Sequence, residues 1–320
     1  TWNNHRRTTG LTTAWQIPLY GIASSRRPPL SWAIKSIETL RLLRRHRPGL
    51  LFVQNPSLAL TILAVVARPF CGYRLVVDAH NEGVRPFDRR GCLVRRITLG
   101  LMGTADVTIV TNRALAGDVR SAGGVPIVLS DRLPEPPPMT ESDPGKTPVI
   151  LAVIATFRRD EPVDEILTAA RMLPECRFVF SGDPGQFLQR KPDLPANVEF
   201  AGYMQDTDYW SFLARATVVC DLTLKPDCLV CGAYEGLALA KPLLLSDNPA
   251  TRETFGDAAI LTDSDPDSIA EAVGAAVRDC PALAANARTL RERYREQWRS
   301  QSTEAWEAIC TAAGFSVSRV

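Results

Sequence analysis

The sequence predicts an α/β protein with two doubly wound domains that face each other across a cleft. Apolar runs of strand length alternate with helical stretches along the chain, as in parallel sheets covered by helices on both faces. A proline-rich stretch interrupts this alternation near the middle, where the charge also changes sign. A chain of 320 residues has room for about two domains.

In the first half, continuous apolar runs bounded by polar residues predict three buried strands, at 50–54, 75–79 and 107–110. The stretches around them predict helices at 31–46, 57–67 and 92–103. We expect the second helix to end before Arg68-Pro69, because proline interrupts helical hydrogen bonding.

The second half repeats this rhythm. Strands are predicted at 149–154, 177–181, 198–200, 217–220, 243–245 and 259–261, and helices at 163–173, 208–214, 233–240, 267–278 and 282–312. In such sheets ligands bind beyond the carboxyl ends of the strands, so two facing sheets predict a site in the cleft between them.

The domain boundary is predicted from the prolines at 136–148, which indicate a stiff linker between domains at 1–135 and 149–298. Residues 1–132 hold 19 Lys and Arg against 7 Asp and Glu, whereas the remainder holds 18 against 28. The basic half indicates an anionic partner. Nucleic acid is not the expected partner, because the sequence has no reader motif and no set of stacking aromatic residues.

Eight cysteines lie in apolar surroundings, which is typical of a reducing cytosol. Cys228 and Cys231 form a close pair, but no second ligand pair accompanies them, and the three histidines lie far away in sequence. We therefore predict no metal site. No apolar run reaches the roughly 20 residues of a membrane-spanning helix. The chain opens without Met, so we expect a short leading segment to be missing.

The most informative stretch contains Asp227 and Glu235, two acids with seven residues between them. Gly232 marks the entry to a helix, which places Asp227 in the loop and Glu235 on the first helical turn. The amides near Cys231, Gly232 and Ala233 would then point into the cleft, where a helix N-terminus suits a diphosphate. Each carboxylate can bind a vicinal diol. Alternatively, Glu235 closes a capping box opened at Gly232, and Asp227 is a solvated loop acid.

This motif resembles the glutamate-x7-glutamate motif of family 4 (group 1) glycosyltransferases, which have the GT-B fold of two Rossmann-like domains. The run from Gly236 to Leu243 also resembles the family. The resemblance covers most of residues 149–265, and three further stretches agree in order and spacing: Asp160-Glu161-Pro162, 180–185, and 197–203 followed by Asp208-Tyr209-Trp210.

The resemblance implies a donor site in the second domain. Asp227 would contact the hydroxyls of the donor sugar and Glu235 the ribose diol, with the amides at 231–233 on the sugar or phosphates and Tyr234 beside them. This chain has Asp instead of the first Glu, and the usual basic pair is not in its usual place. Arg158 and Arg159 are our candidates for the diphosphate; the alternative is an exposed basic loop.

In the first half the resemblance is limited to His5-Arg6-Arg7-Thr8 and Asp78-Ala79-His80-Asn81. It implies that His80 reaches the donor sugar or the acceptor, with His5, Arg6, Arg7 and Asn81 on the acceptor side. His80 follows a predicted strand beside polar residues, so a site histidine is plausible; alternatively it bonds to its own loop. Glu82 or Asp78 would be the general base if the reaction inverts the sugar. The sequence does not choose between inversion and retention.

Residues 30–47 combine tryptophan and isoleucines with six basic residues and a single acid, and a second basic patch follows at Arg89, Arg90, Arg95 and Arg96. A basic amphipathic helix of this kind lies on an anionic leaflet in many proteins. A helix packed on the core, with a solvated basic face, is the alternative.

The sequence therefore predicts a metal-independent hexosyltransferase that moves a sugar from a nucleoside-diphosphate sugar, with no cofactor, to a lipid-linked or polysaccharide precursor. We expect it in the cytoplasm, peripheral at the inner leaflet, with a last helix at 299–320 that crosses back to the first domain as in relatives of this fold. The alternatives are a nucleotide-sugar epimerase of the same fold and a nucleotide-binding paralogue without turnover.

Overall fold

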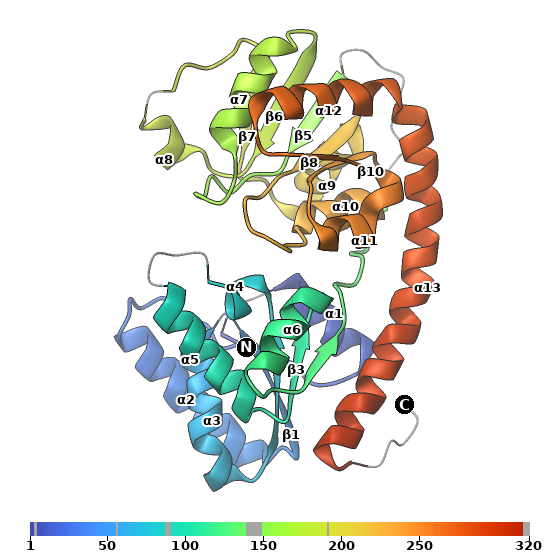
Figure 1. Cartoon of the computed structure of the whole chain (residues 1–320). Helices are drawn as coiled ribbons and strands as arrows, with labels where there is room; N and C mark the ends of the chain where they lie inside the picture. The colour runs from blue at the N-terminus through green and yellow to red at the C-terminus, as the bar shows by residue number, and fades with distance from the viewer. Residues whose placement is uncertain (3–4, 56, 87–90, 139–148, 191, 316–320) are drawn as a thin grey trace. The chain divides into compact units, whose positions relative to one another are not determined.

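The computed structural model describes residues 1–320 except 3–4, 56, 87–90, 139–148, 191 and 316–320. It confirms the predicted fold class, because the chain forms two parallel sheets, each accompanied by helices (Figure 1). The chain divides into two compact units: unit 1 is Thr1–Arg132 with Gln297–Val320, and unit 2 is Leu133–Glu296. Most of the proline-rich linker predicted at 136–148 lies outside the described residues.

Unit 1 contains a four-stranded sheet of order β1-β2-β3-β4, and every pair in it is parallel. The three predicted strands are present. The apolar runs of β2 and β3 are buried, whereas β1 is half-buried from Leu50 to Phe52 and buried from Val53 onward. A fourth strand was not predicted, because it has only three residues and begins at Pro126. The strands are β1 (Leu50–Asn55), β2 (Arg74–Ala79), β3 (Val107–Val110) and β4 (Pro126–Val128).

Two helices of nine residues in unit 1 were not predicted from the sequence, α1 (Arg6–Ala14) and α6 (Arg113–Ser121). The others are α2 (Leu30–His46), α3 (Leu58–Cys71), α4 (Asn81–Val84) and α5 (Gly91–Thr104). The expected end of α3 before Arg68-Pro69 is wrong: the helix runs on to Cys71 with Pro69 inside it. The helix ends instead at Gly72, whose backbone adopts the left-handed conformation with φ 74°.

Unit 2 contains a six-stranded parallel sheet of order β10-β9-β8-β5-β6-β7. All six predicted strands are present. The apolar side chains of β6, β8 and β9 are buried, whereas those of β7, at the edge of the sheet, are half-buried or exposed. The strands are β5 (Val149–Val153), β6 (Cys176–Ser181), β7 (Val198–Gly202), β8 (Val218–Asp221), β9 (Leu243–Ser246) and β10 (Ala259–Thr262).

Side-chain caps begin two of the helices of unit 2: Asn248 accepts the Thr251 amide, and Asp265 accepts the Ser268 amide. Each cap is followed by proline at the first helical position, which suits the fixed φ of proline. The helices are α7 (Val163–Met172), α8 (Gly185–Leu188), α9 (Asp206–Arg215), α10 (Cys231–Ala238), α11 (Pro249–Phe255), a 3-10 turn (Gly256–Ala258) and α12 (Pro266–Arg278).

The last helix, α13 (Cys280–Ala313), is a continuous helix of 34 residues. From Gln297 onward it belongs to unit 1. There the Trp298 indole donates to the Ser130 carbonyl at 2.9 Å. The buried Trp15 indole donates to both the carbonyl and the hydroxyl of Ser302, at 3.1 and 3.0 Å. These indole hydrogen bonds attach the end of α13 to the rest of unit 1.

Candidate functional site

In unit 2, the polar side chains of interest lie where β5 and β8 end and α10 begins. α10 starts at Cys231, so Glu235 is its fifth residue rather than part of the first turn as predicted. The residue before the helix is Val230, which makes no side-chain cap. A capping box between Gly232 and Glu235 is therefore ruled out, because Gly232 already lies inside the helix.

Asp221, the last residue of β8, caps α10 from outside the helix. Its Oδ2 accepts the Gly232 amide at 2.8 Å. A Cβ at position 232 would lie 2.6 Å from the same oxygen, so only glycine fits there. Burial raises the pKa of Asp221 well above its ordinary value; the Gly232 amide opposes this shift, while Glu161 and Glu235 reinforce it. The sequence analysis assigned the Gly232 amide to a diphosphate. That assignment is corrected, because the Gly232 amide already donates its hydrogen bond to Asp221.

Glu235 is 6% exposed and lies near this cap. Its Oε2 accepts a short hydrogen bond of 2.5 Å from the Tyr209 hydroxyl, which comes from α9. A hydrogen bond from a phenol fixes the direction in which a carboxylate presents its second oxygen. Glu235 is therefore a held carboxylate rather than a solvated one.

The loop between β5 and α7 carries Arg158 and Arg159, both exposed. Glu161 shapes this loop, because its carboxylate accepts the amides of Thr156 and Arg158, at 2.8 and 3.3 Å. An ion pair joins this loop to the one before α10: Lys225 Nζ lies 2.7 Å from Asp160 Oδ2, and both side chains are largely buried. The two loops are thus tied together on one side of α10.

The other residues predicted to bind the donor sugar nucleotide differ in how exposed they are. Cys231 is exposed and Ala233 is buried. Asp227 is half-buried with φ 51°, a left-handed conformation that Asp tolerates better than most residues. Tyr234 is misassigned as a donor contact: its ring packs edge-on against Phe255 and Tyr294, with centroids 5.1 and 6.1 Å away.

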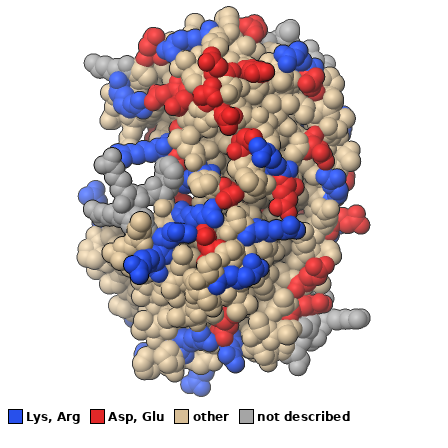
Figure 2. All heavy atoms as spheres, in the orientation of Figure 1, with Lys and Arg blue, Asp and Glu red and all other residues tan. Residues whose placement is uncertain are grey.

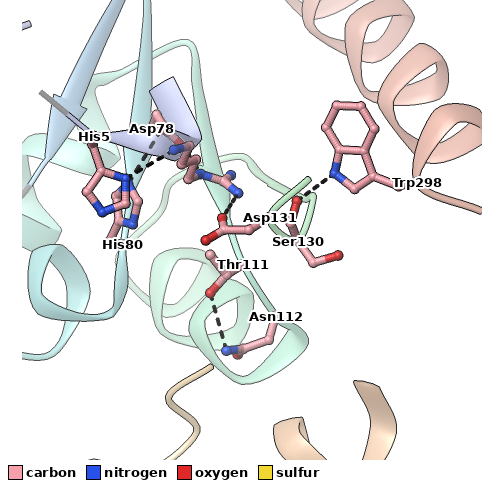
Figure 3. Close-up of polar contacts among 9 residues, drawn as sticks. His5, Asp78, His80, Thr111, Asn112, Ser130, Asp131 and Trp298 are labelled. Carbon is pink, nitrogen blue, oxygen red and sulfur yellow. Dashed lines mark hydrogen bonds and ion pairs between the residues drawn. The ribbon is translucent and has the colours of Figure 1, made fainter. Parts of the chain in front are cut away.

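In unit 1, a buried ion cluster lies at the carboxyl ends of β2 and β4. Arg7 Nε lies 2.7 Å from Asp78 Oδ1, and Arg7 Nη1 lies 2.6 Å from Asp131 Oδ1 (Figure 3). The Arg7 side chain is 1% exposed. Burial opposes its charge, but the two carboxylates hold the pKa of Arg7 above its ordinary value. Burial works to raise the pKa of Asp131, but the Arg7 guanidinium outweighs it and the pKa is lowered.

This cluster corrects the acceptor-side role predicted for Arg7, because its guanidinium bonds to two carboxylates inside the fold. Arg6, the residue before Arg7 and the first of α1, is exposed. Asn81 and Glu82 are half-buried in the short helix α4, which begins after His80.

His5 and His80 lie next to each other, a contact that the sequence analysis did not predict. Their rings meet edge-on with centroids 4.3 Å apart (Figure 3). His5 Nδ1 accepts the Arg7 amide at 3.3 Å. Burial, followed by the charge of His80, lowers the pKa of His5. His80 Nε2 lies 3.7 Å from Asp78 Oδ2, and both of these buried atoms lack a hydrogen-bond partner.

Asp131, Asp221, Tyr209 and Lys225 were not predicted as site residues. Asp221 had a usable signal, because it directly follows the predicted strand at 217–220, where a side chain can reach the carboxyl end of the sheet. Asp131 follows a short strand that was itself missed. The pairings of Tyr209 and Lys225 join segments 26 and 65 residues apart, and no local pattern predicts them.

Among the described residues, no group of three or more His, Cys, Asp or Glu side chains is arranged to hold a metal ion. Within the same part of the chain, no helix is both long and apolar enough to cross a membrane.

Solved structures share this fold over most of the chain. HepE from Anabaena, in complex with UDP and glucose, is 13% identical with a TM-score of 0.70, and the match covers 94% of this chain and 89% of HepE. Sucrose-phosphate synthase from Thermosynechococcus elongatus is 15% identical with a TM-score of 0.72, over 91% and 84%. A putative UDP-N-acetylglucosamine 2-epimerase from Listeria monocytogenes is 13% identical with a TM-score of 0.56, over 88% and 79%.

At these identities the likeness shows a shared fold, the two Rossmann-like domains of GT-B enzymes. A comparison with curated proteins gave no match. The family model of group 1 glycosyl transferases matches residues 139–300, about half of the chain, including the whole of α10 and the loop before it. The chain belongs to the group 1 glycosyl transferases.

Proposed function

We propose that this chain transfers a hexose from a nucleoside-diphosphate sugar to an acceptor hydroxyl, as a family 4-type enzyme that needs neither metal nor cofactor. The observation that carries the proposal is Glu235, a buried carboxylate of α10 that is oriented by Tyr209. The Anabaena structures contain UDP, UDP with glucose, or UDP-glucose. UDP-sugars are therefore the first donors to test.

Unit 2 binds the donor in this proposal. Glu235 accepts hydrogen bonds from the ribose diol, and Asp227 does so from hydroxyls of the sugar. The N-terminal end of α10, at Cys231 and Ala233, faces the diphosphate together with Arg158 and Arg159. Their positive potential stabilises the charge that develops on the departing diphosphate. Asp221 positions α10 by holding the Gly232 amide.

Unit 1 binds the acceptor. Asp78 Oδ2 and His80 Nε2 are buried polar atoms without partners, 3.7 Å apart. Leaving such atoms unpaired is costly, and an acceptor hydroxyl would satisfy both. His5 lies against His80, and Asn81 and Glu82 follow in α4. In an inverting reaction Glu82 or Asp78 removes the proton of the acceptor hydroxyl; a retaining reaction needs no base from the protein.

Replacing Glu235 with Ala is expected to weaken UDP binding about 10- to 150-fold, the scale of about 1.5–3 kcal/mol for a hydrogen bond to a charged group. Titration calorimetry with UDP and GDP measures the effect. Glu199→Ala is the matched control, because Glu199 is an exposed acid of β7 in the same unit. Equal affinities for the wild type and Glu235→Ala would refute the role of Glu235.

Product analysis separates the proposed transfer from its alternatives. Free nucleotide together with a glycosylated acceptor supports transfer. An altered free sugar would instead indicate an epimerase of the same fold, and binding without turnover would indicate a nucleotide-binding paralogue.

The acceptor is proposed to be lipid-linked, and unit 1 to associate with an anionic membrane surface. Helix α3 packs against both α2 and α5 (Figure 1). Together these helices leave large apolar side chains exposed, which we call the three-helix face: Leu30, Trp32, Ile34 and Ile37 on α2; Ile62, Val66 and Phe70 on α3; Leu93 and Ile97 on α5. On α3 they are four residues apart, so they form one stripe.

Charge on the three-helix face favours anionic lipid. α2 ends with Arg44, Arg45 and His46, and α5 carries Arg95 and Arg96. Glu38 is the single acid in these three helices. Figure 2 shows that Lys and Arg are also frequent over unit 1 on the face drawn, while Asp and Glu are frequent over unit 2. Arg89 and Arg90, predicted for the same basic patch, lie outside the described residues.

The double variant Phe70→Ser, Leu93→Ser is expected to lose at least about 10-fold in partitioning to vesicles of phosphatidylglycerol and phosphatidylcholine. These residues are 86% and 69% exposed, and inserting each side chain contributes about 1.5–3 kcal/mol. Vesicle co-sedimentation is the measurement. Tyr203→Ser, a residue of unit 2 that is 79% exposed, is the control. Equal partitioning of the double variant and the control would contradict the proposal.

A further inference from the structure

Two arginines of unit 1 share a single carboxylate. Arg85 Nε lies 2.5 Å from Asp118 Oδ2, and Arg95 Nη2 lies 3.1 Å from Asp118 Oδ1. Arg85 directly follows α4, Arg95 lies in α5 and Asp118 lies in α6. These three helices contact one another (Figure 1). We call Arg85 and Arg95, bonded in this way, the arginine pair at Asp118.

The arginine pair and Asp118 together carry a net positive charge, because two guanidinium groups meet one carboxylate. Arg85 and Asp118 are half-buried, whereas Arg95 is exposed. A guanidinium presents its N–H donors in a fixed plane that matches the oxygens of a phosphate. The shared carboxylate holds both groups in place before a ligand arrives, which reduces the entropy lost on binding. The pair therefore suits a phosphate or diphosphate at the surface of unit 1.

Helix α4 connects the arginine pair to the proposed acceptor residues. The helix begins after His80 and ends before Arg85. The Arg85 amide donates to the Asn81 carbonyl at 2.7 Å, which closes the turn. At a rise of about 1.5 Å per residue, Arg85 lies within about 8 Å of His80 along the helix axis. A sugar ring with an anionic linkage can therefore reach from Asp78 and His80 to the arginine pair.

Helix α5 connects the same pair to the three-helix face. Leu93 and Ile97 are both exposed, and their spacing of four residues places them on one stripe of α5. Arg95 lies two residues from each of them, on another side of the helix, and bonds to Asp118 in α6. The acceptor residues, the arginine pair and the three-helix face therefore follow one another across unit 1 in that order.

We infer that the acceptor carries a phosphate or diphosphate between its sugar and its lipid, and that Arg85 and Arg95 bind this anionic linkage. The inference rests on the proposed function, because it concerns the acceptor of that reaction. The order of the three features is the order of the parts of such a molecule: a sugar hydroxyl, an anionic linkage and an apolar chain. A neutral glycolipid and a free polysaccharide both lack the middle part.

The test compares three soluble probes, added to the full chain without a donor. Hexyl glucosyl diphosphate has a sugar, a diphosphate and an apolar chain. Hexyl glucoside lacks the diphosphate, and inorganic pyrophosphate lacks the other two parts. Titration calorimetry should show hexyl glucosyl diphosphate bound at least about 10-fold more tightly than either of the others, the scale of one charge-assisted hydrogen bond.

Two variants with opposite expected effects separate anion binding from a purely structural role. The double variant Arg85→Gln, Arg95→Gln should lose the preference for the diphosphate probe. Asp118→Asn removes the opposing negative charge but keeps an acceptor oxygen, so it should bind that probe at least as tightly as the wild type. Arg177→Gln is the matched control, because the side chains of Arg177 and Arg95 are both 47% exposed and both pair with an acid.

A further measurement needs no variant. The nuclear magnetic resonance signals of the Nε–H groups of Arg85 and Arg95 should shift when hexyl glucosyl diphosphate is added, and not when hexyl glucoside is added. Unshifted signals would overturn the inference, as would a double variant that keeps the preference or an Asp118→Asn variant that loses it.

The remaining outcomes identify the source of the phosphate. Pyrophosphate that binds as tightly as hexyl glucosyl diphosphate would overturn the inference in favour of free phosphate. Dihexanoyl phosphatidylglycerol that competes equally well would overturn it in favour of bulk lipid head groups. No sugar is transferred in these measurements, and the titration of Glu235→Ala with UDP tests donor binding, so this inference and the proposed function fail separately.

Discussion

Replacing Arg7 with Met is expected to lower the free energy of unfolding of unit 1 by about 3–5 kcal/mol, the cost of breaking a buried ion pair by removing one partner. Without the guanidinium, Asp78 and Asp131 remain close together inside the fold as uncompensated charges. Urea unfolding followed by tryptophan fluorescence measures the loss. Arg6→Met, at the exposed neighbouring position, should change stability by less than about 0.5 kcal/mol.

The loss should also depend on pH. Asp131 has a lowered pKa in the folded chain. Its contribution is therefore present above the pKa of the unfolded chain and is lost as pH falls through the folded value. We expect Arg7→Met to cost more at pH 7 than at a pH well below 3.8, the ordinary pKa of an aspartate. An equal cost for Arg7→Met and Arg6→Met at pH 7 would show that the cluster does not stabilise unit 1.

Replacing Trp15 with Ala is expected to lower the free energy of unfolding of unit 1 by about 3–5 kcal/mol, the range for truncating a buried tryptophan. Trp15 is 6% exposed, and its ring lies against Phe52 and Trp306, with centroids 5.8 and 5.5 Å away. The substitution removes this packing and the indole hydrogen bonds to Ser302. Thermal and urea unfolding report the change.

Two variants separate the contributions of Trp15. Trp15→Phe keeps an aromatic ring but loses the indole donor, and should cost about 1–3 kcal/mol. Trp32→Ala removes a tryptophan that is 53% exposed and should have little effect on unfolding. A loss for Trp32→Ala as large as that for Trp15→Ala would contradict this account of how α13 attaches to unit 1.

The fold was largely predictable because buried parallel strands are continuous apolar runs, and such runs need no knowledge of their neighbours. The three residues of β4 are too few for a pattern to emerge. Pro69 marks a different limit: it was expected to end α3, but a proline near a helix end loses few hydrogen bonds, and Gly72 ends the helix instead.

The candidate site was only partly predictable, because the direction of a side chain depends on what its helix packs against. Arg6 and Arg7 are adjacent and chemically alike, yet one is exposed and the other is buried between two acids. Tyr234 and Glu235 are also adjacent, and Tyr234 packs against Phe255 while Glu235 meets Tyr209. The partners of Arg7, Tyr234 and Glu235 come from distant parts of the chain, which no local spacing reveals.

The membership of α13 has a practical consequence for expressing the two units separately. Unit 2 is an insertion within unit 1, because unit 1 consists of Thr1–Arg132 and Gln297–Val320. A single uninterrupted gene fragment therefore encodes unit 2, and the donor binding proposed for this unit can be tested on that fragment if it folds as a monomeric domain. Unit 1 instead requires its two stretches to be spliced by an artificial connection, and a clone stopped at Arg132 would lack the tryptophan of α13 that bonds to Ser130.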